Sequence, residues 1–170
     1  VAREGEEAFI GAMFQNLGRL LTEYYFPEEA RQIRSAVAAS VRDASSLAAM
    51  VQAETAASIG VLGLSFEDLG LGIAKSWGLP DNLQRCMRRA DGEPPQRVPD
   101  KAPDRLRWLT LAANELTDTL LRTEGDPTAR LSSVAERHAR AIGLSVREIQ
   151  AATDQARQRL AQAAEAMGLQ

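Results

Sequence analysis

The sequence contains a single cysteine and a single histidine, Cys86 and His138, and this scarcity excludes most metal and nucleophile chemistry. One cysteine cannot form an internal disulfide, which suits a reducing compartment. One histidine cannot build a multi-histidine metal site, and a Ser-His-Asp or Cys-His arrangement has only His138 to use. His138 lies in the charged run 135–140, so we expect a solvated histidine on the surface of a helix.

The sequence also lacks long apolar runs and an excess of positive charge. No stretch of about 18 apolar residues is present, and no basic segment with an apolar region and a cleavage site opens the chain. The net charge is −3, which argues against a protein that coats nucleic acid through its phosphates. We therefore expect a cytoplasmic protein with no membrane partner. Because residue 1 is Val rather than Met, we also expect a fragment of a longer protein.

Helical periodicity dominates what is present. Apolar residues recur at steps of three and four, and no convincing alternation of period two is found. The composition, with 45% hydrophobic and 25% charged residues, is ordinary for a globular chain. The sequence thus predicts an all-α bundle of about seven to eight helices. The expected helices cover residues 8–25, 27–41, 45–59, 66–77, 80–87, 106–120, 128–141 and a last helix from 146, with a proline-rich loop over 91–103.

Two of these helices lead to further predictions about packing. The helix over 8–25 should be central and buried on several sides, with a core face of Phe9, Met13, Leu17, Leu20, Leu21 and Tyr24. The last helix has a narrow apolar seam, for which packing on the chain's own bundle is favoured over self-association; it consists of Val146, Ile149, Thr153, Ala156, Leu160, Ala163 and Met167. Trp77 and Trp108 are expected to pack in the core.

Several local patterns predict helix ends and close contacts. Ser65 is followed three residues later by Asp68, and Ser145 by Glu148, which is typical of capped helix starts. The segment 70–76 contains two glycines and a lysine, but it lies inside a predicted helix and Lys75 follows Ala rather than Gly. A phosphate loop is therefore disfavoured, and the glycines are expected to let two helices approach closely.

Three arginines form a candidate interaction face. Arg85, Arg88 and Arg89 are expected on one side of the helix over 80–87 and its end, opposite Leu83, Cys86 and Met87. They are compatible with a phosphate or an acidic partner, or with the wet side of an amphipathic helix.

Two segments resemble a known family. Residues 13–19 (Met-Phe-Gln-Asn-Leu-Gly-Arg) have the shape of the metal-binding helix Leu-Leu-His-Asp-Ile-Gly-Lys of the HD-superfamily phosphohydrolases. Residues 63–70 and the corner Trp77-Gly78-Leu79-Pro80 resemble the HDOD domains, bacterial relatives of those hydrolases in signalling proteins. The resemblance covers about residues 6–122. It implies an HDOD-like helical region over 1–122, corresponding to the C-terminal half of the usual domain, and a helical extension over 123–170 packed on the same bundle.

The resemblance implies that the metal ligands are lost. Gln15 and Asn16 stand at the His-Asp doublet, Phe66 where many relatives have a histidine, and Asn114 at a late aspartate. Neutral amides and a phenyl ring replace charged and imidazole ligands, so no cofactor, bound metal or catalytic residue is expected. Gln15 and Asn16 are expected to be hydrogen-bonding core amides, with a ligand pocket as the alternative.

The expected function is a non-catalytic regulatory module that contacts other domains of a longer signalling protein or a partner protein. One alternative is a sensor for a nucleotide or small anion, using Gln15, Asn16, Asn114 and nearby arginines. A second alternative is a surviving metal-dependent phosphohydrolase with unusual ligands. The preceding helical half of an HDOD domain is missing from the sequence, so a surface that it covers is expected to be exposed, with a homodimer as one possible result.

Overall fold

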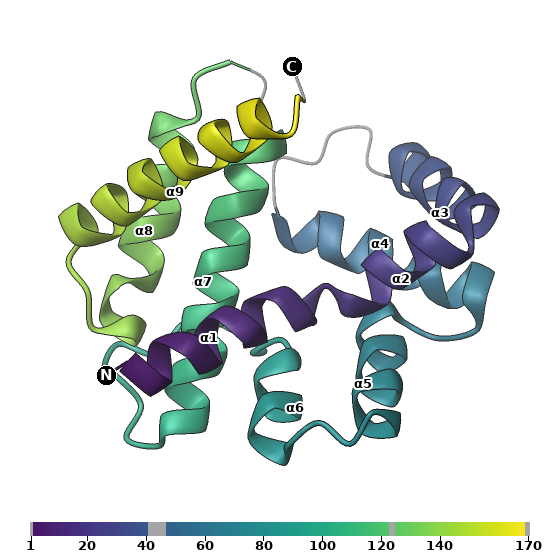
Figure 1. Cartoon of the computed structure of the whole chain (residues 1–170), viewed down its shortest axis with the longest axis horizontal. Helices are drawn as coiled ribbons and strands as arrows, with labels where there is room; N and C mark the ends of the chain where they lie inside the picture. The colour runs from purple at the N-terminus through teal and green to yellow at the C-terminus, as the bar shows by residue number, and fades with distance from the viewer. Residues whose placement is uncertain (1, 41–46, 123–124, 169–170) are drawn as a thin grey trace. The chain divides into compact units, whose positions relative to one another are not determined.

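The computed structural model describes residues 2–40, 47–122 and 125–168. These residues contain nine helices and no strand, which confirms the all-α prediction and exceeds the expected count by one. The helices in chain order are α1 (Ala2–Gln15), α2 (Leu17–Tyr25), α3 (Pro27–Ser40), α4 (Leu47–Leu62), α5 (Phe66–Ser76), α6 (Asp81–Met87), α7 (Ala102–Arg122), α8 (Thr128–Ile142) and α9 (Val146–Ala166) (Figure 1).

The chain divides into two compact units, Val1–Ala90 with α1 to α6 and Asp91–Gln170 with α7 to α9. The proline-rich segment predicted as a loop carries no helix before α7 and lies in the second unit. We predicted an HDOD-like region over 1–122 and an extension over 123–170. The first compact unit ends at Ala90. That the HDOD-like region also includes residues 93–122 stays a prediction.

In the first unit, α2 packs against α3 and α5, α1 against α6, and α3 against α4. Its buried cluster contains Leu17, Ala74 and Met87. Partly buried apolar side chains surround this cluster, namely Phe14, Leu21, Leu71, Ile73 and Leu79. The core therefore joins α2, α5 and α6.

The predicted continuous helix over 8–25 is wrong in two respects. It breaks at Asn16, which separates α1 from α2 and accounts for the additional helix. Its predicted core face is also mostly exposed. After the break, α2 packs with Leu17 toward the core, and a stripe of apolar side chains remains exposed to solvent. The stripe consists of Phe9 (65% exposed), Met13 (54%), Leu20 (58%) and Tyr24 (79%).

Trp77 is likewise not a core residue. It caps the C-terminus of α5 and is 57% exposed, whereas Trp108 on α7 is half-buried. Gly78 follows Trp77 with a φ of +68°, which ends α5 there.

In the second unit, α8 packs against α7 and α9. The seam of α9 is buried only near the start of the helix, at Ile149 and Thr153. Leu160 and Met167 are exposed, so the prediction that the seam packs on the chain's own bundle holds only for its first half.

Both predicted helix starts are confirmed. The Ser65 hydroxyl accepts a hydrogen bond from the backbone N–H of Asp68, and Ser145 and Glu148 form a reciprocal capping box at the start of α9. Within the described residues no single helix is long and apolar enough to cross a bilayer. One bent pair of helices, Ala48–Leu62 with Phe66–Ser76, would be long and apolar enough by length and composition alone.

Candidate functional site

The segment that resembles the hydrolase metal motif lies where α1 ends and α2 begins. Gln15 is the last residue of α1, and Asn16 stands between the helices with φ −96° and ψ 7°. Both side chains are half-buried. The Asn16 side chain makes no capping hydrogen bond to α2, and its backbone carbonyl oxygen accepts from the N–H of Leu20 at 3.0 Å.

Gly18 is a position of close backbone packing in this segment. A Cβ built on Gly18 would lie 2.0 Å from the carbonyl oxygen of Phe66 and 3.1 Å from the backbone nitrogen of Gly70. The backbones of α2 and α5 therefore touch here. For Gly70, this confirms the prediction that the glycines of segment 70–76 let two helices approach closely. Gly72 is different, because a Cβ there would meet nothing within 4 Å.

Arg19 continues the same segment and joins α2 to α4. Its Nη2 donates to Oε2 of Glu54 at 2.5 Å, and the two side chains are 24% and 22% exposed. A pair at this depth is partly desolvated, so its attraction is less screened than that of a surface pair. The segment 15–19 is thus a joint between three helices, made by backbone contact and one ion pair.

The structure brings together only some of the predicted pocket positions. Gln15, Asn16 and Phe66 lie in the first unit, where the backbone of Phe66 rests on Gly18. Asn114 is half-buried on α7 in the second unit, so the structure does not place it with the other three. In the described part of the chain, no three His, Cys, Asp or Glu side chains are grouped so that they could hold a metal ion.

The three predicted arginines do not share one helix face. Helix α6 ends at Met87, so Arg85 is on the helix while Arg88 and Arg89 follow it. Glu67 on α5 contacts both of the latter: its Oε1 lies 3.8 Å from Nη1 of Arg88, and its Oε2 accepts from the backbone N–H of Arg89 at 2.9 Å. Extended backbone at Arg88 (ψ 130°) explains the difference from the prediction.

Arg85 and Arg88 line an open groove of about 530 Å³ between α5 and α6. Lys75 adds a third positive charge, and Asp68 and Asp81 add two negative charges. The groove therefore carries mixed charge with a small positive excess, which is typical of a polar contact surface.

His138 corrects our prediction of a solvated histidine. It is 1% exposed, and its Nε2 lies 2.7 Å from Oε2 of Glu115, which also accepts from Arg137. The physical reason is the face of α8 that it occupies, since Ala135 and Ala141, three residues before and after it, are buried as well. Those small flanking residues were the sequence signal for a packed face, and the surrounding charges hid it.

Glu115 has a pKa below its usual value. Burial by itself raises the pKa of this carboxyl, but the hydrogen bond from His138 and the charges of His138 and Arg137 outweigh burial and lower it. Glu115 is therefore the ionised acceptor, and Nε2–H of His138 is the donor. Nδ1 of His138 is buried without a hydrogen-bond partner among the described residues.

These features define an all-helical protein whose N-terminal unit joins α2, α4 and α5 at residues 15–19. Residues 1–92 match the family model of the HDOD domain, and the chain belongs to the HDOD family. The family relates the chain to the HD superfamily and to a regulatory or signalling role. No curated protein matches the chain, and no solved structure matches it.

Proposed function

We propose that this chain is a non-catalytic HDOD regulatory module that works through contacts with other domains of a longer signalling protein or with a partner protein. The observation that carries the proposal is the joint at residues 15–19. Where the resembling hydrolases have the ligand pair His-Asp, this chain has the amides Gln15 and Asn16, next to the backbone contact of Gly18 with α5 and the Arg19–Glu54 ion pair with α4.

The chemistry of the side chains supports the same proposal. The amides of Gln15 and Asn16 offer a carbonyl oxygen but no negative charge and no imidazole nitrogen. Catalytic divalent ions in such sites depend on carboxylate and imidazole ligands to fix the ion and to activate water. The segment is suited to hold helices at fixed spacing, and a rigid bundle can transmit a bias from one contact to another.

Turnover of a phosphodiester in the presence of Mn²⁺ or Mg²⁺ tests the proposal. We expect the chain and the Gln15→Leu variant both to hydrolyse bis(p-nitrophenyl) phosphate no faster than the metal ions alone, because neither holds a catalytic metal. Metal-dependent turnover that disappears in Gln15→Leu would establish the phosphohydrolase instead.

The exposed apolar stripe on α1 and α2 supports a more specific proposal about which half of an HDOD domain this segment forms. Four large apolar side chains are exposed on two consecutive helices, and large exposed apolar patches usually mark a contact site. We propose that residues 1–92 form the C-terminal half of an HDOD domain and that a preceding helical half covers the stripe.

Hydrogen exchange tests this placement. The amides of residues 9–24 should exchange more slowly in the protein that the full reading frame encodes than in the 170-residue chain, because covered helices open less often. Equal exchange rates, or a reading frame without a preceding helical half, would contradict the placement.

A further inference from the structure

The second unit contains a pocket between α7, α8 and α9 that the regulatory role does not use. Its volume is about 310 Å³, at the lower end of the range of small-molecule sites. The apolar part of its lining consists of Ala135 and Ile149, which are buried, and Leu116 and Leu131, which are half-buried; the other five lining residues are polar or charged. A pocket of this size and lining suits a small metabolite with an apolar body rather than a nucleotide.

The space exists because the seam of α9 uses a small side chain where the helix passes over α7 and α8. Thr153 occupies a seam position and lines the pocket, and its hydroxyl donates to the carbonyl oxygen of Ile149 at 2.8 Å. The hydroxyl is therefore satisfied within the helix, and only its methyl group contributes packing. A leucine at such a position would occupy the space, as in a coiled-coil seam.

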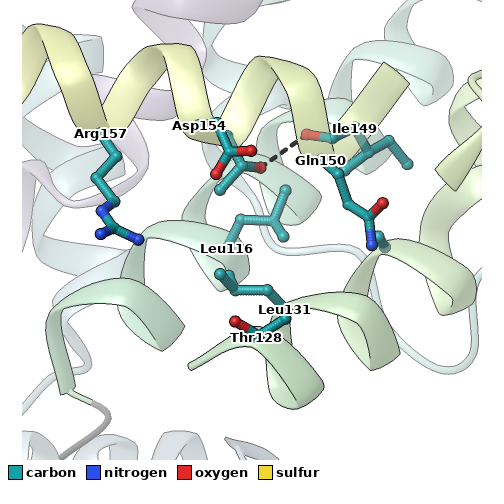
Figure 2. Close-up of a pocket in the computed structure, with 9 residues that line it drawn as sticks. Leu116, Thr128, Leu131, Ile149, Gln150, Asp154 and Arg157 are labelled. Carbon is teal, nitrogen blue, oxygen red and sulfur yellow. Dashed lines mark hydrogen bonds between the residues drawn. The ribbon is translucent and has the colours of Figure 1, made fainter. Parts of the chain in front are cut away.

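Two opposite charges stand at the rim. Asp154 and Arg157 project from α9 on the side that faces Leu116 and Leu131 (Figure 2). Within the described residues, the Asp154 carboxylate makes no hydrogen bond or ion pair. Among the same residues, Arg157 has a longer-range attraction to Asp126. Three residues apart on one helix, the two charged groups lie about one turn from each other.

The other polar side chains of the lining are already engaged. The Thr128 hydroxyl donates to Asp126 Oδ1 at 2.5 Å, and the Gln150 amide donates to the Ser132 hydroxyl at 3.2 Å. Recognition of a polar head group therefore depends on Asp154 and Arg157.

We propose that this pocket binds a small zwitterion with an aliphatic side chain, of the chemical class of the free branched-chain amino acids. Its ammonium group binds Asp154, its carboxylate binds Arg157, and its aliphatic side chain lies on Leu116, Leu131 and Ile149. Charge-assisted hydrogen bonds at both ends fix the head group, and the apolar surface fixes the side chain. The site lies entirely within the second unit, so it is independent of the proposed role of the HDOD segment.

Calorimetric titration of the 170-residue chain with L-leucine tests the proposal, with thermal unfolding as a second readout. Leucine should bind and raise the melting temperature, because a ligand of the folded state stabilises that state. Two analogues each lack one charge: 3-methylbutylamine has no carboxylate, and 4-methylpentanoate has no ammonium. Each should bind at least about tenfold more weakly than leucine.

Charge variants distinguish the two ends of the ligand. Asp154→Asn should weaken leucine binding about tenfold or more and leave 4-methylpentanoate unchanged, whereas Arg157→Gln should weaken leucine and leave 3-methylbutylamine unchanged. Glu165→Gln and Arg159→Gln are matched controls on exposed positions of α9 outside the pocket, and both should bind leucine normally. Thr153→Leu should abolish binding while raising the melting temperature, because it fills the cavity.

The proposal fails if leucine produces neither heat nor a thermal shift at millimolar concentration. It also fails if leucine binds to Asp154→Asn and Arg157→Gln as tightly as to the unchanged chain. It fails equally if the controls Glu165→Gln and Arg159→Gln weaken binding as much as Asp154→Asn and Arg157→Gln do.

Discussion

Gly18 is the residue on which the packing of α2 against α5 depends. Because a Cβ there would lie 2.0 Å from a backbone oxygen and 2.8 Å from the Phe66 carbonyl carbon, neither neighbour can move aside as a flexible side chain would. Gly18→Ala should therefore lower the free energy of unfolding by about 1–3 kcal/mol or more, measured by urea denaturation.

Gly72 is the matched control, since it lies inside α5 but has open space where its Cβ would be. Gly72→Ala should raise the free energy of unfolding by up to about 1 kcal/mol through helix propensity. Equal effects of the two substitutions would show that the contact between α2 and α5 is not as close as described.

Glu115 makes the stability of the second unit depend on pH. Its pKa is lower in the folded state than the usual value of 4.5, so the unfolded chain binds a proton first as the pH falls. The stabilisation is complete above about pH 4.5 and is lost as the pH falls through the lower folded pKa. Thermal unfolding between pH 6 and pH 3 should show this loss.

Glu115→Gln should flatten the pH dependence in that window, because the titrating carboxyl is gone. Glu136→Gln is a matched control, since Glu136 is exposed on α8 beside the same cluster. An unchanged slope in Glu115→Gln would mean that the buried contact with His138 does not form.

At the scale of the element, helix starts are where local sequence acts most directly. The capping box of α9 uses the Ser145 hydroxyl and the Glu148 carboxylate to satisfy two backbone N–H groups. Ser145→Ala should cost about 1 kcal/mol of stability in the second unit. Ser133→Ala on the exposed side of α8 should have little effect, and a loss of similar size there would point to a general cost of removing hydroxyls.

Helix boundaries at caps and breakers were therefore predictable from the sequence. Ser65, Pro27 and Ser145 act within one turn of their own position, so their effect does not depend on the rest of the fold. The direction in which a helix faces was less predictable. Periodicity identifies an apolar stripe on 9–24 but does not say what covers it, and only Leu17 of the predicted face is buried.

In the candidate site, too, local features were predictable from the sequence and contacts between distant residues were not. The sequence pointed to residues 13–19 as a motif that resembles a metal-binding helix and to Gly70 as a close contact, and Gly18 of this motif meets Gly70 where α2 contacts α5. It missed the Glu115–His138 contact, because the partners are 23 residues apart on different helices and the charges around His138 suggested exposure. It also could not show that α6 ends before Arg88.

At the scale of the whole molecule, the chain combines two units with different contents. The first unit contains nearly all of the HDOD match and the joint at residues 15–19. The second contains the buried Glu115–His138 contact and the three-helix pocket. The division places the proposed contact role and the proposed ligand site in separate units, so each can be tested by substitutions that leave the other unchanged.

The central claim is that the HDOD segment works without a catalytic metal. The most direct measurement is a titration of the chain with Mn²⁺, followed by the electron paramagnetic resonance signal of the free ion, with Asn16→Leu as the comparison. We predict that the chain and the variant leave the same fraction of Mn²⁺ free, because Asn16 supplies no metal ligand. A stoichiometric site in the chain that disappears in Asn16→Leu would contradict the account.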